Sequence, residues 1–256
     1  MKHLFSPDGE AALAAVMALR PLLAFDFDGT LAPIVARPDE ARVSQAVARR
    51  LGRLALALPL AIVSGRRADD VRARLAFEPG YIIGNHGAED PSLAVDVDLS
   101  AVFDRVRLRL HKYAEALDEA GVTVEDKGQS LALHYRLSRD RERAFALIES
   151  MTSGLGPDVE VFGGKMVVNV VASDAPDKAY AVTSLVARSG AGSALFVGDD
   201  VNDEPVFARA EPSWLTVKVG REDPDSRARF YLDHSGEVAS MLDRMLALLD
   251  GFSETR

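Results

Sequence analysis

The N-terminal third of the chain alternates short, wholly apolar runs with segments of helical spacing. The apolar runs cover residues 22–25, 60–63 and 81–83, and polar residues or glycine follow each of them directly. Strands that are apolar on both faces are typical of parallel sheets covered by helices on both sides. In such sheets, ligands bind beyond the carboxyl ends of the strands. The pattern therefore predicts an α/β fold with a mainly parallel sheet, and a site where these strands end.

The middle of the chain follows a different pattern. Over residues 88–173, helices take turns with pairs of short strands, which indicates an α+β module of antiparallel strands. The α/β pattern then resumes, with an apolar run at 194–197 and a further expected strand at 215–219. We therefore expect a discontinuous Rossmann-like core over residues 1–87 and 174–256, with the α+β module inserted as a cap domain over 88–173.

Composition and charge exclude several classes of function. The net charge of −9 argues against a nucleic-acid binder, and the absence of cysteine excludes thiolate nucleophiles and Cys-ligated metal sites. The longest apolar run, residues 54–63, contains Pro59 and is shorter than the ~20 residues of a membrane-spanning helix. Residues 1–22 carry Asp8 and Glu10 and no cleavage pattern. We expect a cytoplasmic monomer that binds neither nucleic acid nor membranes.

Two carboxylates stand where the first apolar run ends, in the string FDFDGTL at 25–31. Asp26 and Asp28 are two residues apart, so in extended backbone both side chains project to one side. Like charges held that close are costly unless a cation or a proton compensates for them. Gly29 lets the chain turn sharply, and Thr30 supplies a hydroxyl. The alternative is an acidic loop with no chemical role.

A second acidic group lies in the string GDDVNDE at 198–204, directly after another apolar run. Its carboxylates, among them Asp199 and Asp203, form a set of hard oxygen ligands suited to Mg²⁺. The alternative is the acidic first turn of a helix, where aspartate is common. Together with Asp26 and Asp28, the string favours a metal site.

Two further positions offer groups that bind phosphate. Ser64-Gly65-Arg66 presents a hydroxyl, a backbone N–H and a guanidinium at the start of a helical segment, which favours an anion. Lys178 stands near the start of its own helix and adds a positive charge, although a single lysine is usually a surface residue.

In this order, the four pieces resemble the haloacid dehalogenase superfamily of phosphotransferases, and the resemblance covers the whole chain. It implies that Asp26 is the nucleophile that becomes an aspartyl phosphate, and that Asp28 protonates the leaving alcohol and then activates water. It implies that Ser64 and Lys178 hold the transferring phosphate. It also implies a Mg²⁺ site formed by Asp26, the main-chain carbonyl of Asp28, Asp199 and, in support, Asp203.

Within that superfamily, the chain is similar to the trehalose-6-phosphate phosphatase family. The matching strings are DFDGTLAPI at 26–34, SGR at 64–66, HGA at 86–88, SLALHYR at 130–136, GKMVV at 164–168 and GDDVNDE at 198–204. The chain departs from the family at four positions. Asn85 and Asn169 stand where the family has glutamate, Ala179 replaces a glycine, and Asn202 replaces a threonine.

Nine polar residues are candidates for contacts with the substrate: Thr30, Arg66, Asn85, His86, Lys127, His134, Arg136, Lys165 and Asn169. An amide at 85 and 169 still bonds a sugar hydroxyl, but the lost charge-assisted acceptor is worth about 1–2 kcal/mol. Other interpretations remain for single residues. His134 could satisfy a hydrogen bond inside the cap, Arg136 could pair with an acid, and His86 could be an ordinary loop residue.

The resemblance implies a Mg²⁺-dependent phosphatase acting on a small-molecule sugar phosphate, with trehalose 6-phosphate as the leading substrate. One alternative is another glycosyl phosphate, such as sucrose 6-phosphate or glucosyl- or mannosyl-3-phosphoglycerate. A second is a non-catalytic domain that binds sugar phosphates, which would have no need for Asp26, Asp28, Asp199 and Lys178 together.

Overall fold

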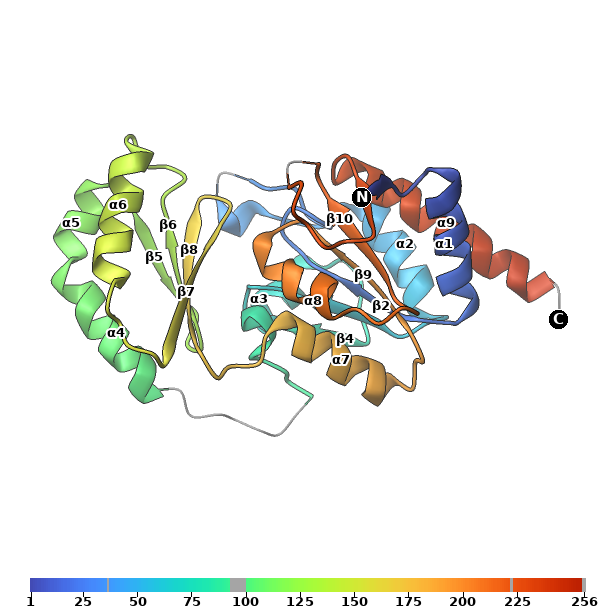
Figure 1. Cartoon of the computed structure of the whole chain (residues 1–256), viewed down its shortest axis with the longest axis horizontal. Coiled ribbons are helices and arrows are strands. Elements are labelled where there is room, and N and C mark those ends of the chain that lie inside the picture. The colour runs from blue at the N-terminus through green and yellow to red at the C-terminus, as the bar shows by residue number, and fades with distance from the viewer. Residues whose placement is uncertain (36, 93–99, 222, 255–256) are drawn as a thin grey trace. The chain divides into compact units, whose positions relative to one another are not determined.

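The structure is a computed structural model, and it describes four stretches of the chain: residues 1–35, 37–92, 100–221 and 223–254. The chain divides into two compact units (Figure 1). We call Met1–Ser92 with Pro176–Arg256 the core unit, and Leu93–Ala175 the inserted unit.

The described part of the core unit contains a seven-stranded sheet in which every neighbouring pair of strands is parallel. In the order in which they lie across the sheet, its strands are β1 (Lys2–His3), β11 (Phe230–Leu232), β10 (Leu215–Val219), β9 (Ala194–Gly198), β2 (Leu22–Phe25), β3 (Leu60–Val63) and β4 (Tyr81–Ile83). The five core strands that the sequence predicts all form. Strand β1 was not predicted, because two residues are too short to show a pattern, and β11, which is as long as β4, was missed.

Helices cover both faces of this sheet (Figure 1). The helices of the core unit are α1 (Pro7–Ala18), α2 (Gln45–Ala55), α3 (Ala68–Arg74), α7 (Lys178–Ser189), α8 (Glu204–Arg209) and α9 (Gly236–Glu254). Strand β2 is buried on both sides: Leu23 and Phe25 pack in the cluster with α1, α2 and α9, whereas Leu22 and Ala24 pack in the cluster with α7 and α8. This arrangement confirms the predicted α/β fold class.

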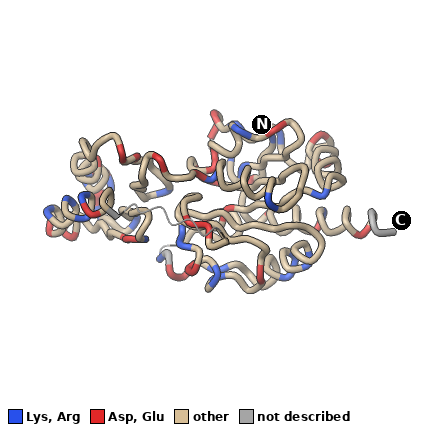
Figure 2. Tube along the Cα trace, turned by 90° about the horizontal axis from the view of Figure 1, so that it is seen from below, with Lys and Arg blue, Asp and Glu red and all other residues tan. Residues whose placement is uncertain are grey.

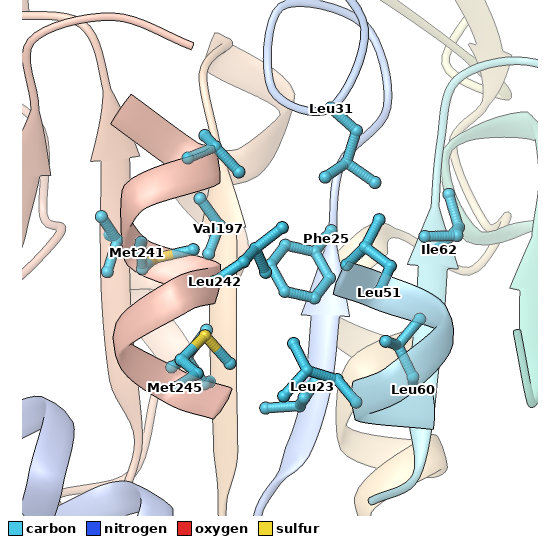
Figure 3. Close-up of a cluster of buried hydrophobic side chains, with 14 of the residues drawn as sticks. Leu23, Phe25, Leu31, Leu51, Leu60, Ile62, Val197, Met241, Leu242 and Met245 are labelled. Atoms are coloured by element: carbon cyan, nitrogen blue, oxygen red, sulfur yellow. The ribbon is translucent and has the colours of Figure 1, made fainter. Parts of the chain in front are cut away.

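Figure 3 shows the first of these clusters at the centre of the sheet. The Phe25 ring lies between Leu242 of α9 and Leu51 of α2, and all three side chains are fully buried. Burying an aromatic or leucine side chain of this kind contributes about 1.5–3 kcal/mol. The cluster therefore fixes in place the strand that Asp26 follows.

The inserted unit has its own four-stranded antiparallel sheet within the described residues. Its strands, in spatial order, are β5 (Thr123–Asp126), β6 (Leu131–His134), β8 (Val167–Ala172) and β7 (Val159–Gly164). Its helices are α4 (Ser100–Lys112), α5 (Ala114–Glu119) and α6 (Arg141–Thr152). Leu131 and Leu133 pack with these helices in one core, so Ala132 and His134 lie on the opposite face of the sheet. We call this second face the polar face.

Basic and acidic residues are interspersed in both units (Figure 2). Among the described helices, none combines the length with the apolar character that crossing a bilayer requires.

Candidate active site

The carboxyl ends of four adjacent strands, β4, β3, β2 and β9, meet at one edge of the core sheet. Asp26 follows β2, Ser64 follows β3, and Asp199 follows β9. The 3-10 turn Asn85–Gly87 follows β4. Lys178 is the first residue of α7, and its side chain joins the group. The core fold thus gathers residues from five separate places in the sequence.

At the centre of this edge, Lys178 lies between two carboxylates. Its Nζ donates to Asp26 Oδ1 over 2.6 Å and to Asp203 Oδ1 over 2.7 Å. Lys178 is 1% exposed, Asp26 5% and Asp203 0%. Buried charges are stable only when they are paired and hydrogen-bonded, and here both partners of the lysine are buried with it.

The environment shifts the ionisation of both Asp26 and Lys178. Burial raises the pKa of the Asp26 carboxyl well above its ordinary value; Asp203 and Asp199 add to the shift, and Lys178 opposes it. Burial by itself lowers the pKa of Lys178, but Asp203 and Asp26 outweigh it and hold that pKa above its ordinary value. The ammonium therefore keeps its charge, whereas burial disfavours the ionised form of Asp26 and positive charge nearby favours it.

Local structure fixes where Lys178 stands. The side chain of Asp177 accepts the N–H of Tyr180 over 2.7 Å and so caps α7, which begins at Lys178. The turn after β4 packs closely against this helix start. A Cβ on Gly87, whose φ is +120°, would lie 2.3 Å from the carbonyl oxygen of Asp177. Glycine is therefore required at this contact.

Asp203 organises the loop that follows β9. Its Oδ2 accepts the backbone N–H groups of Asp199 and Asp200, over 2.8 and 3.0 Å. Its Oδ1 is held by Lys178. A Cβ on Gly198 would lie 2.3 Å from Asp203 Cγ, so this glycine lets the carboxylate fold back onto the strand end. Asp203 therefore holds the backbone of the loop, and the side chain of Asp199 extends from that loop.

The donor set at this edge fits a divalent metal ion. Asp26, Asp199 and Asp203 each offer a carboxylate oxygen within 4.8 Å of the others, and all three are buried. Three buried carboxylates around one lysine leave an excess of negative charge, which a hard cation with oxygen ligands offsets. Gly29 makes room for Asp199, because a Cβ on Gly29 would lie 2.0 Å from Asp199 Oδ2. Thr30 Oγ1 donates to Asp199 Oδ1 over 3.4 Å.

Asp28 and Arg66 face each other beside this group. The guanidinium of Arg66 grips both carboxylate oxygens of Asp28, from Nε over 2.6 Å and from Nη2 over 2.8 Å. Its Nη1 donates to Asp70 over 2.9 Å. Although burial by itself lowers the pKa of Arg66, Asp28 and Asp70 raise it above its ordinary value. Ser64, which is buried, accepts the backbone N–H of Arg66 with its Oγ over 3.2 Å.

Asn85 and His86 form a turn with positive φ, at +47° and +61°. Non-glycine residues rarely adopt this conformation, and where they do it is held by surrounding contacts and is often found at functional sites. Here Asn85 Nδ2 donates to Glu89 Oε2 over 2.8 Å, and the same oxygen accepts the N–H of Ala68 over 3.0 Å. The N–H of His86 bonds the carbonyl of Ser64 over 2.9 Å. The turn thus braces the Ser64 loop.

The remaining candidates lie in the inserted unit, where the structure divides them between two places. Cross-strand register puts Asn169 opposite Ala132, so it shares the polar face with His134. Arg136 lies beyond the end of β6, and its Nη2 donates to the carbonyl of Lys165, which is exposed.

Glu125 belongs to the polar face as well, and sequence reasoning missed it. It pairs with Ala132 in register, its Oε2 lies 2.9 Å from His134 Nε2, and Lys127 Nζ is 3.9 Å away. Glu125 stands in the short strand TVED, whose alternation in the sequence gives no sign of which face is buried.

Lys218 is the second residue that sequence reasoning missed. It is 4% exposed on β10, and its Nζ donates to the carbonyl of Asp200 over 3.3 Å and to Glu204 Oε1 over 3.0 Å. It therefore ties the acidic loop to the neighbouring strand. The sequence did carry a signal for this residue, because a lysine stands inside the expected strand 215–219 and a charge at a buried strand position needs a partner.

Comparison with known proteins identifies the family of the chain. The trehalose-phosphatase family model matches residues 24–235. The "Probable trehalose-phosphate phosphatase" of Sinorhizobium fredii is 35% identical over 238 residues, which cover 89% of this chain and 88% of that protein. An uncharacterized glycosyl hydrolase of Mycobacterium tuberculosis is 30% identical over 241 residues, or 88% of this chain, but the chain spans only 18% of its length.

Solved structures share the fold. The C-terminal domain of trehalose-6-phosphate phosphatase from C. albicans has a TM-score of 0.78 at 23% identity, with 93% of this chain and 96% of that chain covered. A haloacid dehalogenase-like hydrolase from B. subtilis has a TM-score of 0.60 at 18% identity, with 87% and 98% covered. The predicted resemblance to the haloacid dehalogenase fold is thereby confirmed. The family match over residues 24–235 and the 35% identity to the Sinorhizobium protein show that the chain belongs to the trehalose-phosphatase family.

Proposed function

We propose that this chain hydrolyses trehalose 6-phosphate to trehalose and inorganic phosphate. The observation that carries the proposal is the buried pair of Lys178 and Asp26, in a member of this family. Lys178 Nζ lies 2.6 Å from Asp26 Oδ1, where the strands of the core sheet end. A carboxylate buried at a strand end, with a permanent cation beside it, suits attack on an anionic phosphate.

In the first step, an oxygen of Asp26 forms a bond to phosphorus and the bond between phosphorus and the sugar oxygen breaks. Asp28 supplies the proton that the departing sugar oxygen needs, since an alkoxide is a poor leaving group. Lys178 and Ser64 hold the transferring phosphate and offset its charge.

In the second step, a water molecule attacks the phosphorus of the aspartyl phosphate. Asp28 now takes a proton from this water, the bond between phosphorus and Asp26 breaks, and inorganic phosphate leaves. Both carboxylates return to their starting state, so the cycle needs no further reactant.

Mg²⁺ is the cofactor of this proposal. Asp26, Asp199 and the main-chain carbonyl of Asp28 would hold the ion, and Asp203 would support the loop behind them. When bound, a divalent cation supplies charge that keeps Asp26 ionised and lowers the repulsion between carboxylate and phosphate.

We assign the choice of sugar to the inserted unit, as a cap domain. The polar face carries His134, Glu125 and Asn169, which offer the donors and acceptors that sugar hydroxyls require. With Glu125 present, this face has a carboxylate even though Asn169 replaces the family's glutamate. We therefore expect the departures at 85 and 169 to be compatible with trehalose 6-phosphate.

The test is phosphate release by the full chain with Mg²⁺ from trehalose 6-phosphate, glucose 6-phosphate, sucrose 6-phosphate and glucosyl- and mannosyl-3-phosphoglycerate. The proposal expects kcat/KM for trehalose 6-phosphate to exceed that for the others by about 100-fold, as for a site that bonds several sugar hydroxyls. A preference for another sugar phosphate would contradict the assignment of trehalose 6-phosphate as the substrate but not the phosphatase mechanism. Release that persists undiminished in Asp26→Asn would overturn the nucleophile.

A further inference from the structure

A chain of four charged side chains runs from Asp28 into helix α3. Arg66 contacts Asp28 with Nε and Nη2 and Asp70 with Nη1, so at least three of its five N–H donors point at carboxylates. Arg74 in turn grips Asp70, with Nε on Oδ2 over 2.7 Å and Nη2 on Oδ1 over 2.5 Å. We call Asp28, Arg66, Asp70 and Arg74 the α3 relay.

The far end of the α3 relay is anchored on the backbone. Arg74 Nη1 donates to the carbonyl of Asp39 over 2.7 Å and to that of Ala41 over 3.3 Å. The side chains of Arg66 and Arg74 are 10% and 9% exposed. Planar guanidinium groups that are buried and bonded bidentately to carboxylates have one preferred orientation. The relay is therefore a rigid support, unlike a pair of surface charges.

The exposed end of this support is Asp28, whose side chain is 42% exposed. A side chain with that much freedom samples several rotamers unless a partner holds it. An acid or base acts only when its oxygen lies within hydrogen-bond reach of the proton it transfers. The Arg66 fork fixes the plane of the Asp28 carboxylate, and the Phe27 ring, 5.5 Å from Arg66 Cζ, packs beside the guanidinium.

We propose that Arg66 is a positioning residue that aims the Asp28 carboxylate, with Asp70 and Arg74 holding Arg66 in place, and that it is not a ligand of the substrate's phosphate. The proposal deepens the proposed function and rests on it. It assigns roles to Asp70 and Arg74, neither of which the motifs single out. It also reassigns Arg66, which the sequence placed among the phosphate-binding groups.

The two roles of Arg66 have different kinetic consequences for p-nitrophenyl phosphate. In the first step, the bond from Asp26 to phosphorus forms and the aryl oxygen leaves as p-nitrophenolate, which needs no proton. The second step still needs a base in position to take the proton of the attacking water. If the Asp28 carboxylate is no longer held in position, only the second step slows. If a phosphate ligand is lost, every phosphate species binds more weakly.

The experiment is stopped-flow and steady-state kinetics of full-length Arg66→Lys with Mg²⁺ and p-nitrophenyl phosphate. Lysine keeps the charge and cannot form the fork. We expect a burst close to one equivalent of p-nitrophenolate, followed by turnover about 10- to 100-fold slower than wild type. The inhibition constant for inorganic phosphate should stay within about three-fold, a shift of well under 1 kcal/mol.

A second variant keeps the test decisive if Arg66→Lys does not fold. This variant is Asp70→Asn, since Asp70 contacts Arg66 but not Asp28. We expect the same burst with a smaller loss of turnover, about three- to ten-fold. The matched control is Arg67→Gln, which breaks the neighbouring exposed pair of Arg67 and Asp69 and should leave both phases unchanged.

The outcomes separate this inference from the proposed function. If the wild-type chain releases no phosphate from any ester, the function fails. If wild type is active and Arg66→Lys raises KM and the phosphate inhibition constant about ten-fold or more without a burst, Arg66 is a phosphate ligand and the inference fails. If Asp70→Asn behaves as wild type, Asp70 has no positioning role and the relay is overturned.

Discussion

Lys178 and Asp26 are 152 residues apart in the sequence, and Lys178 Nζ lies 2.6 Å from Asp26 Oδ1. The residues come from the two halves of the core unit, on either side of the inserted unit. The same lysine bonds Asp203, so one buried ammonium joins the strand that carries the nucleophile to the acidic loop after β9. Because Lys178 bonds both carboxylates, a change to either of them alters the charge around a buried ammonium.

Asp26→Asn should abolish turnover and leave the chain folded. We expect phosphate release to fall by about 1,000-fold or more, because an amide cannot form the aspartyl phosphate. Lys178 keeps Asp203 as its partner, and one buried negative charge is gone. In metal-free buffer we therefore expect the Tm to rise by about 2–4 °C, equivalent to about 1 kcal/mol. Calorimetry checks this, and a clear fall in Tm would contradict it.

Gly29→Ala should damage the acidic site more than the fold. The added Cβ would lie 2.0 Å from Asp199 Oδ2, and φ at this position is +83°. We expect Asp199 to be displaced, with Mg²⁺ binding weakened by about 10-fold or more in titration calorimetry. The control is Gly192→Ala, where a Cβ meets nothing within 4 Å. Equal Mg²⁺ affinity in both variants would contradict the close approach.

Lys218→Met should weaken the same site from the other side. Without the amine, Glu204 loses a buried partner and the carbonyl of Asp200 loses its donor. We expect a loss of about 2–3 kcal/mol in the free energy of unfolding, and a several-fold weaker affinity for Mg²⁺. Urea denaturation and titration calorimetry measure the two effects. Lys112→Met, at an exposed position of α4, serves as the control and should change neither.

Glu125→Gln should affect sugar phosphates alone. It removes the charge beside His134 on the polar face and leaves the core unit untouched. We expect kcat/KM for trehalose 6-phosphate to fall about 10-fold, mainly through KM, because a charge-assisted hydrogen bond is worth about 1.5–3 kcal/mol. Turnover of p-nitrophenyl phosphate should stay unchanged. Glu119→Gln at the end of α5 is the control, and an equal effect there would argue against a specific role for Glu125.

Asp126→Asn should destabilise the inserted unit in a pH-dependent way. Hydrogen bonds from Arg107, over 2.6 and 3.0 Å, lower the pKa of Asp126 below its ordinary value of 3.8, although burial opposes the shift. A lowered pKa stabilises the fold above pH 3.8 and loses that effect as the pH falls further. Because the pair is partly exposed, we expect about 0.5–1 kcal/mol at pH 7.

Urea denaturation at pH 7 and at pH 3 tests this sign. The difference between wild type and Asp126→Asn should be present at pH 7 and should shrink at pH 3, which lies below the ordinary pKa of 3.8, because the unfolded wild-type chain then binds a proton at this carboxyl. Asp118→Asn, on the exposed side of α5, is the control. A difference that grows toward acid pH would contradict the assigned pKa direction.

The position of a strand is predicted best from the sequence where both of its faces are buried. Leu22–Phe25 is apolar on both faces, so its place inside the sheet and the position of Asp26 at its end follow directly. The same reasoning places Asp199 after β9. Strand β1 escapes prediction because a two-residue strand depends on its pairing with β11, not on its own pattern.

Partnerships between distant side chains could not be predicted in this way. Nothing in the string SGR indicates that Arg66 bonds a carboxylate 38 positions earlier. Likewise, Glu125 and His134 become neighbours only through the register of β5 and β6. Motifs identify which chemical groups are present, whereas tertiary packing decides which of them meet.

Strand β2 has β3 on one side and β9 on the other, so one of its neighbours is synthesised only after the whole inserted unit. Synthesis proceeds from the N-terminus, and until β9 is made that edge of β2 presents the unpaired backbone N–H and C=O groups of an apolar strand. The step that covers this edge also delivers Lys178 and Asp199. A nascent chain that stops short of residue 194 therefore lacks both the second neighbour of β2 and Asp199, so the pairing of β2 and the acidic loop of the site form together.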